Sequence, residues 1–168
     1  ERTNLELLVL EGRIRIGLND LAGARLLFNQ VLSIEKNNLE AQFGLAELDI
    51  ASGQNSSAGL KYLQALKVRP DSQKALLSLA LLNEAEGNRS AAESYLEQAL
   101  RFHASDPGVR YAAAKLAFEQ GDSARAQKHL ETALTVERDF SAARLLLAQV
   151  FMAQKRPELA VETLQDML

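Results

Sequence analysis

The sequence predicts an all-α protein, built as a right-handed α-α superhelix of antiparallel helix pairs. Three observations predict this fold. Residue types repeat every 34 positions, apolar residues inside each repeat follow helical spacing, and turn-forming residues recur at one place in the repeat. The 168 residues are 47% hydrophobic, which is typical of a folded domain, and no segment indicates a β-strand.

The period is carried by columns of like residues, and no insertion interrupts them. One column contains only alanine and another only leucine: Ala24, Ala58, Ala92, Ala126 and Ala160, then Leu32, Leu66, Leu100, Leu134 and Leu168. The repeats span residues 5–38, 39–72, 73–106, 107–140 and 141–168, the last one being shorter. We therefore expect residues 1–168 to form a single array, which is a fragment of a longer chain.

Each repeat contains two predicted helices of about 12 to 14 residues, or roughly 20 Å each. The first repeat opens with a capping box, Thr3-Asn4-Leu5-Glu6, and the fourth with an N-cap and a proline, Asp106-Pro107. The two helices of a repeat are separated by a residue that favours a helix C-terminus, followed by a residue that favours the N-cap of the next helix. These breaks are Asn19-Asp20, Gly53-Gln54, Gly87-Asn88 and Gly121-Asp122, with Lys155-Arg156-Pro157 in the fifth repeat.

Two columns of small residues predict where the paired helices cross, because close approach requires alanine or glycine. One is the alanine column, and the other is Gly12, Ala46, Ala80, Ala114 and Ala148. A column of larger residues, Phe28, Tyr62, Leu96, Leu130 and Leu164, is expected to pack one hairpin against the next. The last repeat leaves such residues uncovered, so weak self-association through uncapped ends is expected.

Composition and charge exclude several functions. A net charge of −3 argues against a nucleic-acid partner, and the absence of cysteine excludes disulfides, thiolate metal sites and a cysteine nucleophile. The most apolar stretch, residues 145–153, is too short to insert in a membrane. His103 and His129 lack the spacing of metal ligands and are interpreted as surface or interface residues. We predict no catalytic residue, metal or cofactor, and the compartment is left open between cytoplasm and periplasm.

The repeat resembles the tetratricopeptide repeat family over almost the whole chain. The residues that carry the resemblance are the small residue at position 8, alanine at 20, an aromatic residue or leucine at 24 and leucine at 28. Position 4, often tryptophan in the family, is Leu8, Gln42, Leu76, Arg110 and Arg144, and the family proline at position 32 occurs only as Pro70. The resemblance implies a non-enzymatic scaffold or adaptor with a protein or peptide partner. The alternative is a partner-presenting or substrate-presenting arm of a secretion, pilus-assembly or polysaccharide-export machine, or of a glycosyltransferase.

In that family the ligand usually lies in a groove lined by the first helix of each repeat. Residues carried over to this groove are Val9, Arg13, Ile16, Phe43, Glu47, Ile50, Leu77, Leu81, Tyr111, Lys115, Phe118, Leu145, Gln149 and Met152. Most are apolar, which suggests a partner, although packing between first helices would also explain positions 5 and 12 of each repeat.

Two further expectations concern charged residues. The family's carboxylate clamp is predicted to be absent, because of its five positions, Val9, Arg13, Gly44, Lys74 and Ser78, only Lys74 has the matching residue. On the second helices, basic residues alternate with acids and are interpreted as a solvated face: Arg25, Lys61, Arg101, Arg125 and Lys128, with Glu93, Glu97 and Glu131.

Overall fold

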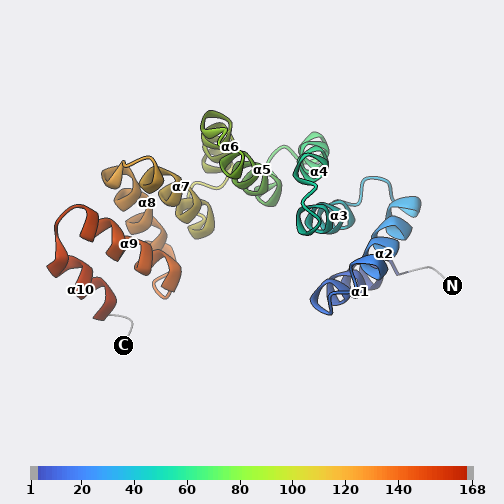
Figure 1. Cartoon of the computed structure of the whole chain (residues 1–168), viewed down its shortest axis with the longest axis horizontal. Helices are drawn as coiled ribbons and strands as arrows, with labels where there is room; N and C mark the ends of the chain where they lie inside the picture. Colours follow the sequence, from blue (N-terminus) through green and yellow to red (C-terminus); the bar gives the residue numbers. More distant parts are fainter. Residues whose placement is uncertain (1–3, 166–168) are drawn as a thin grey trace. The chain divides into compact units, whose positions relative to one another are not determined.

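The computed structural model describes residues 4–165, and there it contains ten α-helices joined by short turns and loops (Figure 1). The helices are α1 (Leu5–Gly17), α2 (Leu21–Ile34), α3 (Leu39–Ala51), α4 (Asn55–Val68), α5 (Gln73–Ala85), α6 (Arg89–Phe102), α7 (Pro107–Glu119), α8 (Ser123–Val136), α9 (Ser141–Ala153) and α10 (Pro157–Gln165). No strand occurs within this range, so the predicted all-α class of paired helices is confirmed.

The turns inside the pairs lie where the sequence predicts them. The backbone has a positive φ at Asn19 (60°), Gly53 (72°), Gly87 (78°), Gly121 (82°) and Lys155 (60°). Glycine adopts this left-handed conformation without strain and asparagine tolerates it, whereas lysine pays a steric cost. The lysine at this place in the fifth repeat is therefore the least favourable of the five turn residues.

Side-chain caps begin most of the helices. The caps whose side chains accept a hydrogen bond from a backbone N–H three residues later are Asn4, Asp20, Asn38, Ser72, Asp106 and Asp122. The predicted capping box of the first repeat is wrong in one respect, because the cap is Asn4. Its side-chain oxygen is 3.2 Å from the nitrogen of Leu7, which places Glu6 at the second helical position instead of the third.

The chain divides into two compact units, Glu1–Glu86 and Gly87–Leu168. In the first, the ring of Phe28 on α2 packs against the backbones of α1 and α3. A Cβ atom added at Gly12 would lie 2.7 Å from this ring, and one added at Gly44 would lie 2.4 Å from it. Both helices can approach the buried ring because they carry glycine at these positions. Phe28 therefore joins the first hairpin to the next helix, as predicted for its column.

In the second unit, α7, α8, α9 and α10 share one hydrophobic core. Ala114 of α7, Ala126 of α8, Ala148 of α9 and Ala160 of α10 belong to this core and are at most 5% exposed. Leu130 is fully buried beside them, whereas Leu164, near the end of α10, is 38% exposed. The small columns thus lie inside the hairpins as predicted, and Leu168 of the leucine column lies outside the described residues.

The interpretation of the second helices as a solvated face is only partly correct for the first unit, because Arg25 and Lys61 also contact a buried acid. Asp49 of α3 is only 1% exposed and accepts hydrogen bonds from three side chains. Lys61 Nζ lies 2.5 Å, Ser57 Oγ 2.6 Å and Arg25 Nη2 3.0 Å from its carboxylate oxygens. Burial opposes ionisation, but hydrogen bonds from Lys61, Ser57 and Arg25 outweigh it and hold the pKa of Asp49 below its ordinary value. Arg25 and Lys61 therefore connect α2 and α4 to a buried charge on α3.

Candidate partner-binding surface

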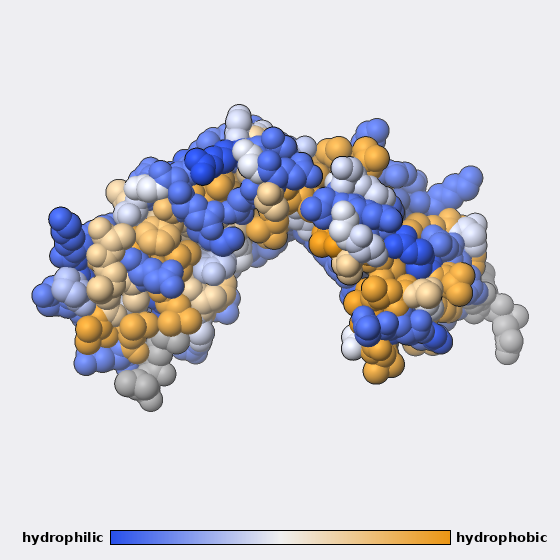
Figure 2. Space-filling model, in the orientation of Figure 1, coloured by the Kyte–Doolittle hydropathy of each residue, from blue (hydrophilic) through white to orange (hydrophobic). Residues whose placement is uncertain are grey.

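In the first unit, the residues predicted to line a groove differ in exposure. Val9 and Phe43 are buried, at 8% and 4%, so their side chains contribute to packing. The Phe43 ring lies 5.8 Å from the ring of Tyr62, and Lys74 Nζ lies 5.0 Å above it. Of the remaining predicted residues, Ile50 and Leu81 are exposed, at 40% and 52%, Arg13 is exposed, and Ile16, Glu47 and Leu77 are half-buried. Figure 2 shows that hydrophobic side chains reach the molecular surface among hydrophilic ones.

Charged groups on this face of the first unit pair across neighbouring repeats. Arg13 of α1 pairs with Glu40 of α3, and Glu47 of α3 pairs with Lys74 of α5, 2.6 Å apart. Both pairs join position 9 of one repeat to position 2 of the next. Lys74, which alone matched the carboxylate clamp, is therefore engaged with Glu47 and the Phe43 ring. A small cleft of about 240 Å³ remains between α1 and α3, lined by Glu6, Val9, Leu10, Arg13, Asn38 and Glu40.

In the second unit, the predicted residues come together around a larger cleft. It lies between α7 and α9 and has a volume of about 450 Å³. Its lining is Tyr111, Lys115, Phe118, Glu119, Ala142, Leu145, Leu146 and Gln149. Five of the six residues predicted for this unit are among them, and the sixth, Met152, is 59% exposed on α9. We call this feature the α7–α9 cleft.

Aromatic side chains in the α7–α9 cleft are held by the surrounding structure. The Tyr111 ring packs against the Phe140 ring with centroids 5.3 Å apart and planes tilted by 48°. Tyr111 and Phe118 also pack against the buried core of the unit. Leu145 is 50% exposed on the opposite wall. The cleft therefore presents apolar surface whose aromatic rings are fixed before any ligand binds.

At the α7–α9 cleft, position 2 of the fifth repeat has no charged side chain that could pair with position 9 of the fourth repeat. Lys115 is at position 9, and the residue 27 positions later, where Glu40 follows Arg13 and Lys74 follows Glu47, is Ala142. Alanine has no charged group to pair with Lys115, whose carboxylate partner at 3.5 Å is Glu119 of the same helix. The small side chain of Ala142 forms part of the cleft wall.

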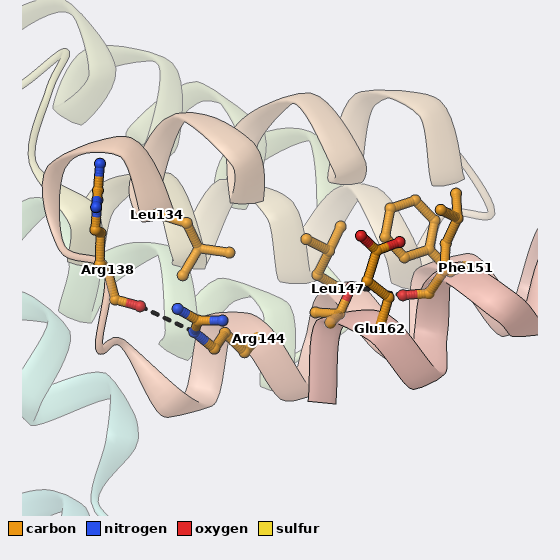
Figure 3. Close-up of a pocket in the computed structure, with 8 residues that line it drawn as sticks. Leu134, Arg138, Arg144, Leu147, Phe151 and Glu162 are labelled. Atoms are coloured by element: carbon orange, nitrogen blue, oxygen red, sulfur yellow. Dashed lines mark hydrogen bonds between the residues drawn. The ribbon is translucent and has the colours of Figure 1, made fainter. Parts of the chain in front are cut away.

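A second cavity of the second unit, about 490 Å³, lies among α8, α9 and α10 (Figure 3). Leu134, Leu147 and Phe151 form its apolar side, and the dashed line marks the 2.9 Å hydrogen bond from Arg144 Nε to the carbonyl oxygen of Arg138. None of its lining residues is one of the predicted groove residues. It is therefore separate from the surface that the sequence indicates.

The hydrogen bond of Arg144 belongs to a repeated feature that sequence analysis missed. At position 4, Gln42 Nε2, Arg110 Nε and Arg144 Nε each donate to the backbone carbonyl six residues earlier, at 3.2, 2.6 and 2.9 Å. These polar residues, at a place where the family often has tryptophan, tie the loop between repeats to the following helix. The recurrence of polar residues at one repeat position was the available signal.

The two histidines differ in environment. His129 is only 9% exposed, so it is an interface residue between α7 and α8, and His103 is half-buried. Burial, followed by the positive charges of Arg110, Arg125 and Lys128, lowers the pKa of His129 to about 4. Within residues 4–165, no three His, Cys, Asp or Glu side chains come close enough to hold a metal ion. Over the same range, no helix has the length and apolar character that a membrane span requires.

The helix pairs and their period of 34 residues define a helical repeat protein. Sequence patterns of the tetratricopeptide repeat match residues 15–59, 43–107 and 111–168. The chain belongs to the tetratricopeptide repeat family. Members of this family generally act as protein-interaction scaffolds and are typically not catalytic, which implies protein partners. No curated protein sequence matches the chain.

Several solved structures have the same fold. A structure of PilF from Pseudomonas aeruginosa aligns with a TM-score of 0.84 and 14% identity, over 98% of this chain and 76% of that one. One chain in the structure of the APC/C hetero-tetramer Cut9–Hcn1 aligns with a TM-score of 0.80 and 21% identity, over 96% of this chain and 32% of that one. MamA from Desulfovibrio magneticus aligns with a TM-score of 0.76 and 13% identity, over 97% and 92%. At these identities the similarity establishes the fold alone.

Proposed function

We propose that this protein is a non-enzymatic interaction scaffold that binds an apolar segment of a partner protein in the α7–α9 cleft. The observation that carries the proposal is the convergence of Tyr111, Phe118 and Leu145 on one cleft. Its volume of about 450 Å³ lies in the range of typical ligand clefts. Aromatic residues in partly enclosed sites are the common hot spots of protein interfaces.

The first helices of the first unit, taken by themselves, offer a weaker candidate surface for a partner. There, Arg13 and Glu47 are engaged with Glu40 and Lys74, and Phe43 is covered. Pairing of both charges leaves this surface electrostatically balanced, and rim charges of this kind contribute little to affinity. The exposed Ile50 and Leu81 are the residues of this unit that we propose as partner contacts.

The proposal can be tested by selecting ligands from a displayed library of random 12-residue peptides. Selected peptides are expected to contain bulky apolar residues. Tyr111→Ala and Phe118→Ala should each weaken their binding by about 5-fold to 150-fold, which corresponds to about 1 to 3 kcal/mol for truncation of an important interface residue. Isothermal titration calorimetry would measure the affinities, and far-UV circular dichroism would check that the helices remain.

A matched control is Phe102→Ala, which removes an aromatic ring that is 53% exposed on α6 of the same unit. It should leave the affinity within about twofold of the parent. Peptides that bind Tyr111→Ala and Phe118→Ala as tightly as the parent would show that the α7–α9 cleft is not the site.

A second proposed role, a partner-presenting arm of a larger assembly, uses the same cleft. The similarity to PilF and to the APC/C subunits is a similarity of fold and does not select that role. Binding of an isolated peptide by the 168-residue chain would support partner binding in the cleft. This result is expected both for an independent scaffold and for an arm of a larger assembly.

A further inference from the structure

A group of basic residues lies in the second unit, outside the α7–α9 cleft. Arg125, Lys128 and His129 lie within about one turn of α8, and Arg110 of α7 contacts His129. Residues three and four positions apart are neighbours on a helix surface, so Arg125 is next to both Lys128 and His129. Arg110 and Tyr111 are consecutive in α7, and consecutive side chains project about 100° apart. The basic group is therefore on a different side of α7 from Tyr111.

The contact between Arg110 and His129 determines which nitrogen of the neutral histidine ring carries the proton. Arg110 Nη1 lies 3.1 Å from His129 Nδ1. A guanidinium can only donate hydrogen bonds, so Nδ1 accepts, and the neutral ring carries its proton on Nε2. In the part of the chain that the structure describes, Nε2 has no acceptor, and the one fully enclosed side-chain polar atom without a partner is Gln42 Oε1. The Nε2–H group therefore reaches solvent and can donate to a ligand.

The positive charges of this group are only partly compensated. Arg125 pairs with Glu93 of α6, with nitrogen and oxygen 2.7 Å apart. Arg110 instead donates to two neutral acceptors, the carbonyl oxygen of Ala104 at 2.6 Å and the His129 ring. Among residues 4–165, neither Arg110 nor Lys128 has a carboxylate within salt-bridge distance. Arg110 and Lys128 thus have no direct ion-pair partner beside this neutral donor, and the acid of α8, Glu131, three residues after Lys128, accepts a hydrogen bond from Gln127.

This arrangement matches a phosphate monoester better than a carboxylate. A phosphorylated side chain has a charge of about −1.5 to −2 at pH 7 and three strong acceptor oxygens. A carboxylate has a single charge and two oxygens in one plane. The second negative charge of the phosphate matches the second cation of the basic group. Its third acceptor oxygen matches the Nε2–H donor of His129.

We propose that Arg110, Lys128 and His129 bind the phosphate of a phosphorylated serine or threonine in a partner protein. Arg110 supplies charge-assisted hydrogen bonds from the guanidinium nitrogens that it does not use for Ala104 and His129. Lys128 leaves the α8 backbone about 100° from His129 and supplies the second charge only by folding its long side chain back towards the ring, and His129 donates through Nε2. The proposed site is local, so it is compatible with the net charge of −3, which disfavours extended polyanions.

The test is a titration at pH 7 that follows the ring resonances of the two histidines by NMR. The probe is N-acetyl-O-phosphoserine N-methylamide, and the matched probe is the corresponding glutamate derivative at equal ionic strength. The phosphoserine probe should shift the His129 resonances saturably, while those of His103, in the α6–α7 loop, serve as internal reference. The glutamate probe should bind at least fivefold more weakly.

Variants separate this site from general charge and from the α7–α9 cleft. Lys128→Gln should weaken phosphoserine binding by at least fivefold, whereas Lys67→Gln, which removes an exposed lysine of α4, should not change it. Tyr111→Ala should leave the phosphoserine titration unchanged. The proposal for this site and the proposal for the α7–α9 cleft can therefore be refuted independently. Arg110→Lys keeps the charge and serves as a second variant, expected to weaken binding less than Arg110→Gln.

Three outcomes would overturn the proposal. One is a His129 shift that equal concentrations of sodium chloride reproduce. Another is equal affinity for the glutamate probe. The third is Lys128-dependent binding to vesicles containing phosphatidic acid in the absence of binding to the phosphoserine probe, which would make the ligand a lipid.

Discussion

Replacement of the buried carboxylate Asp49→Asn is expected to destabilise the first unit by about 2 to 3 kcal/mol. The substitution preserves volume but puts an amide NH₂ group where a carboxylate oxygen accepted a hydrogen bond. Lys61 and Arg25 can only donate, so at least one of them loses its acceptor. Breaking a fully buried ion pair costs roughly 3 to 5 kcal/mol. The cost is smaller here because the side chains of Lys61 and Arg25 are 26% and 40% exposed and can be rehydrated.

Urea denaturation followed by circular dichroism would measure this loss, with Asp139→Asn as a matched control at an exposed position of the second unit. A double-mutant cycle with Lys61→Gln should give a coupling free energy of about 1 kcal/mol or more. Because the pKa of Asp49 is lowered in the folded state, its contribution is present above the unfolded pKa and disappears as the pH falls through the folded value. A variant within about 0.5 kcal/mol of the parent at pH 7 would refute the assigned role.

Three further predictions concern packing, pH and backbone conformation. Ala126→Leu should destabilise the protein by about 1 to 3 kcal/mol, because Ala126 is fully buried between helices, and an unchanged urea midpoint would contradict the assigned crossing. For His129, burial and the nearby cations lower the folded pKa to about 4 from 6.5, so stability should be full above pH 6.5 and decline by at most about 3 kcal/mol towards pH 4. His129→Gln, which keeps an acceptor for Arg110, should show a smaller decline in acid denaturation curves, and an identical decline would exclude the histidine as its source. Lys155→Gly should raise stability by up to about 1 kcal/mol because φ is 60° there, whereas Asn19→Gly should change it less; a loss of melting temperature at Lys155→Gly would contradict a strained turn.

The helix pairs could be predicted from the sequence because periodicity and turn chemistry are local signals that five repeats reinforce. Residues of the α7–α9 cleft could be named from their repeat position, since first-helix positions recur on one face. Burial of Phe43 could not be predicted, because it depends on Tyr62 and Lys74 from other helices. The burial of Asp49 depends on two residues of α4 and one of α2, and no single repeat shows this convergence. Pairing between positions 9 and 2 was present as a constant spacing of 27 residues, and a search for complementary charges at that spacing would have found it.

The fit of Phe28 between two glycines has a consequence for the order of the repeats. Position 24 of a repeat meets position 6 of the next, as Phe28 meets Gly44. Along the chain, the residues at these two positions are Phe28 with Gly44, Tyr62 with Ser78, Leu96 with Ala112 and Leu130 with Leu146. Large residues precede small ones at the beginning, and leucine precedes leucine near the end. A shuffled chain that placed the first repeat directly before the fifth would bring the Phe28 ring into steric conflict with Leu146. Each repeat is therefore complementary to its own neighbours, and the repeats are not interchangeable modules.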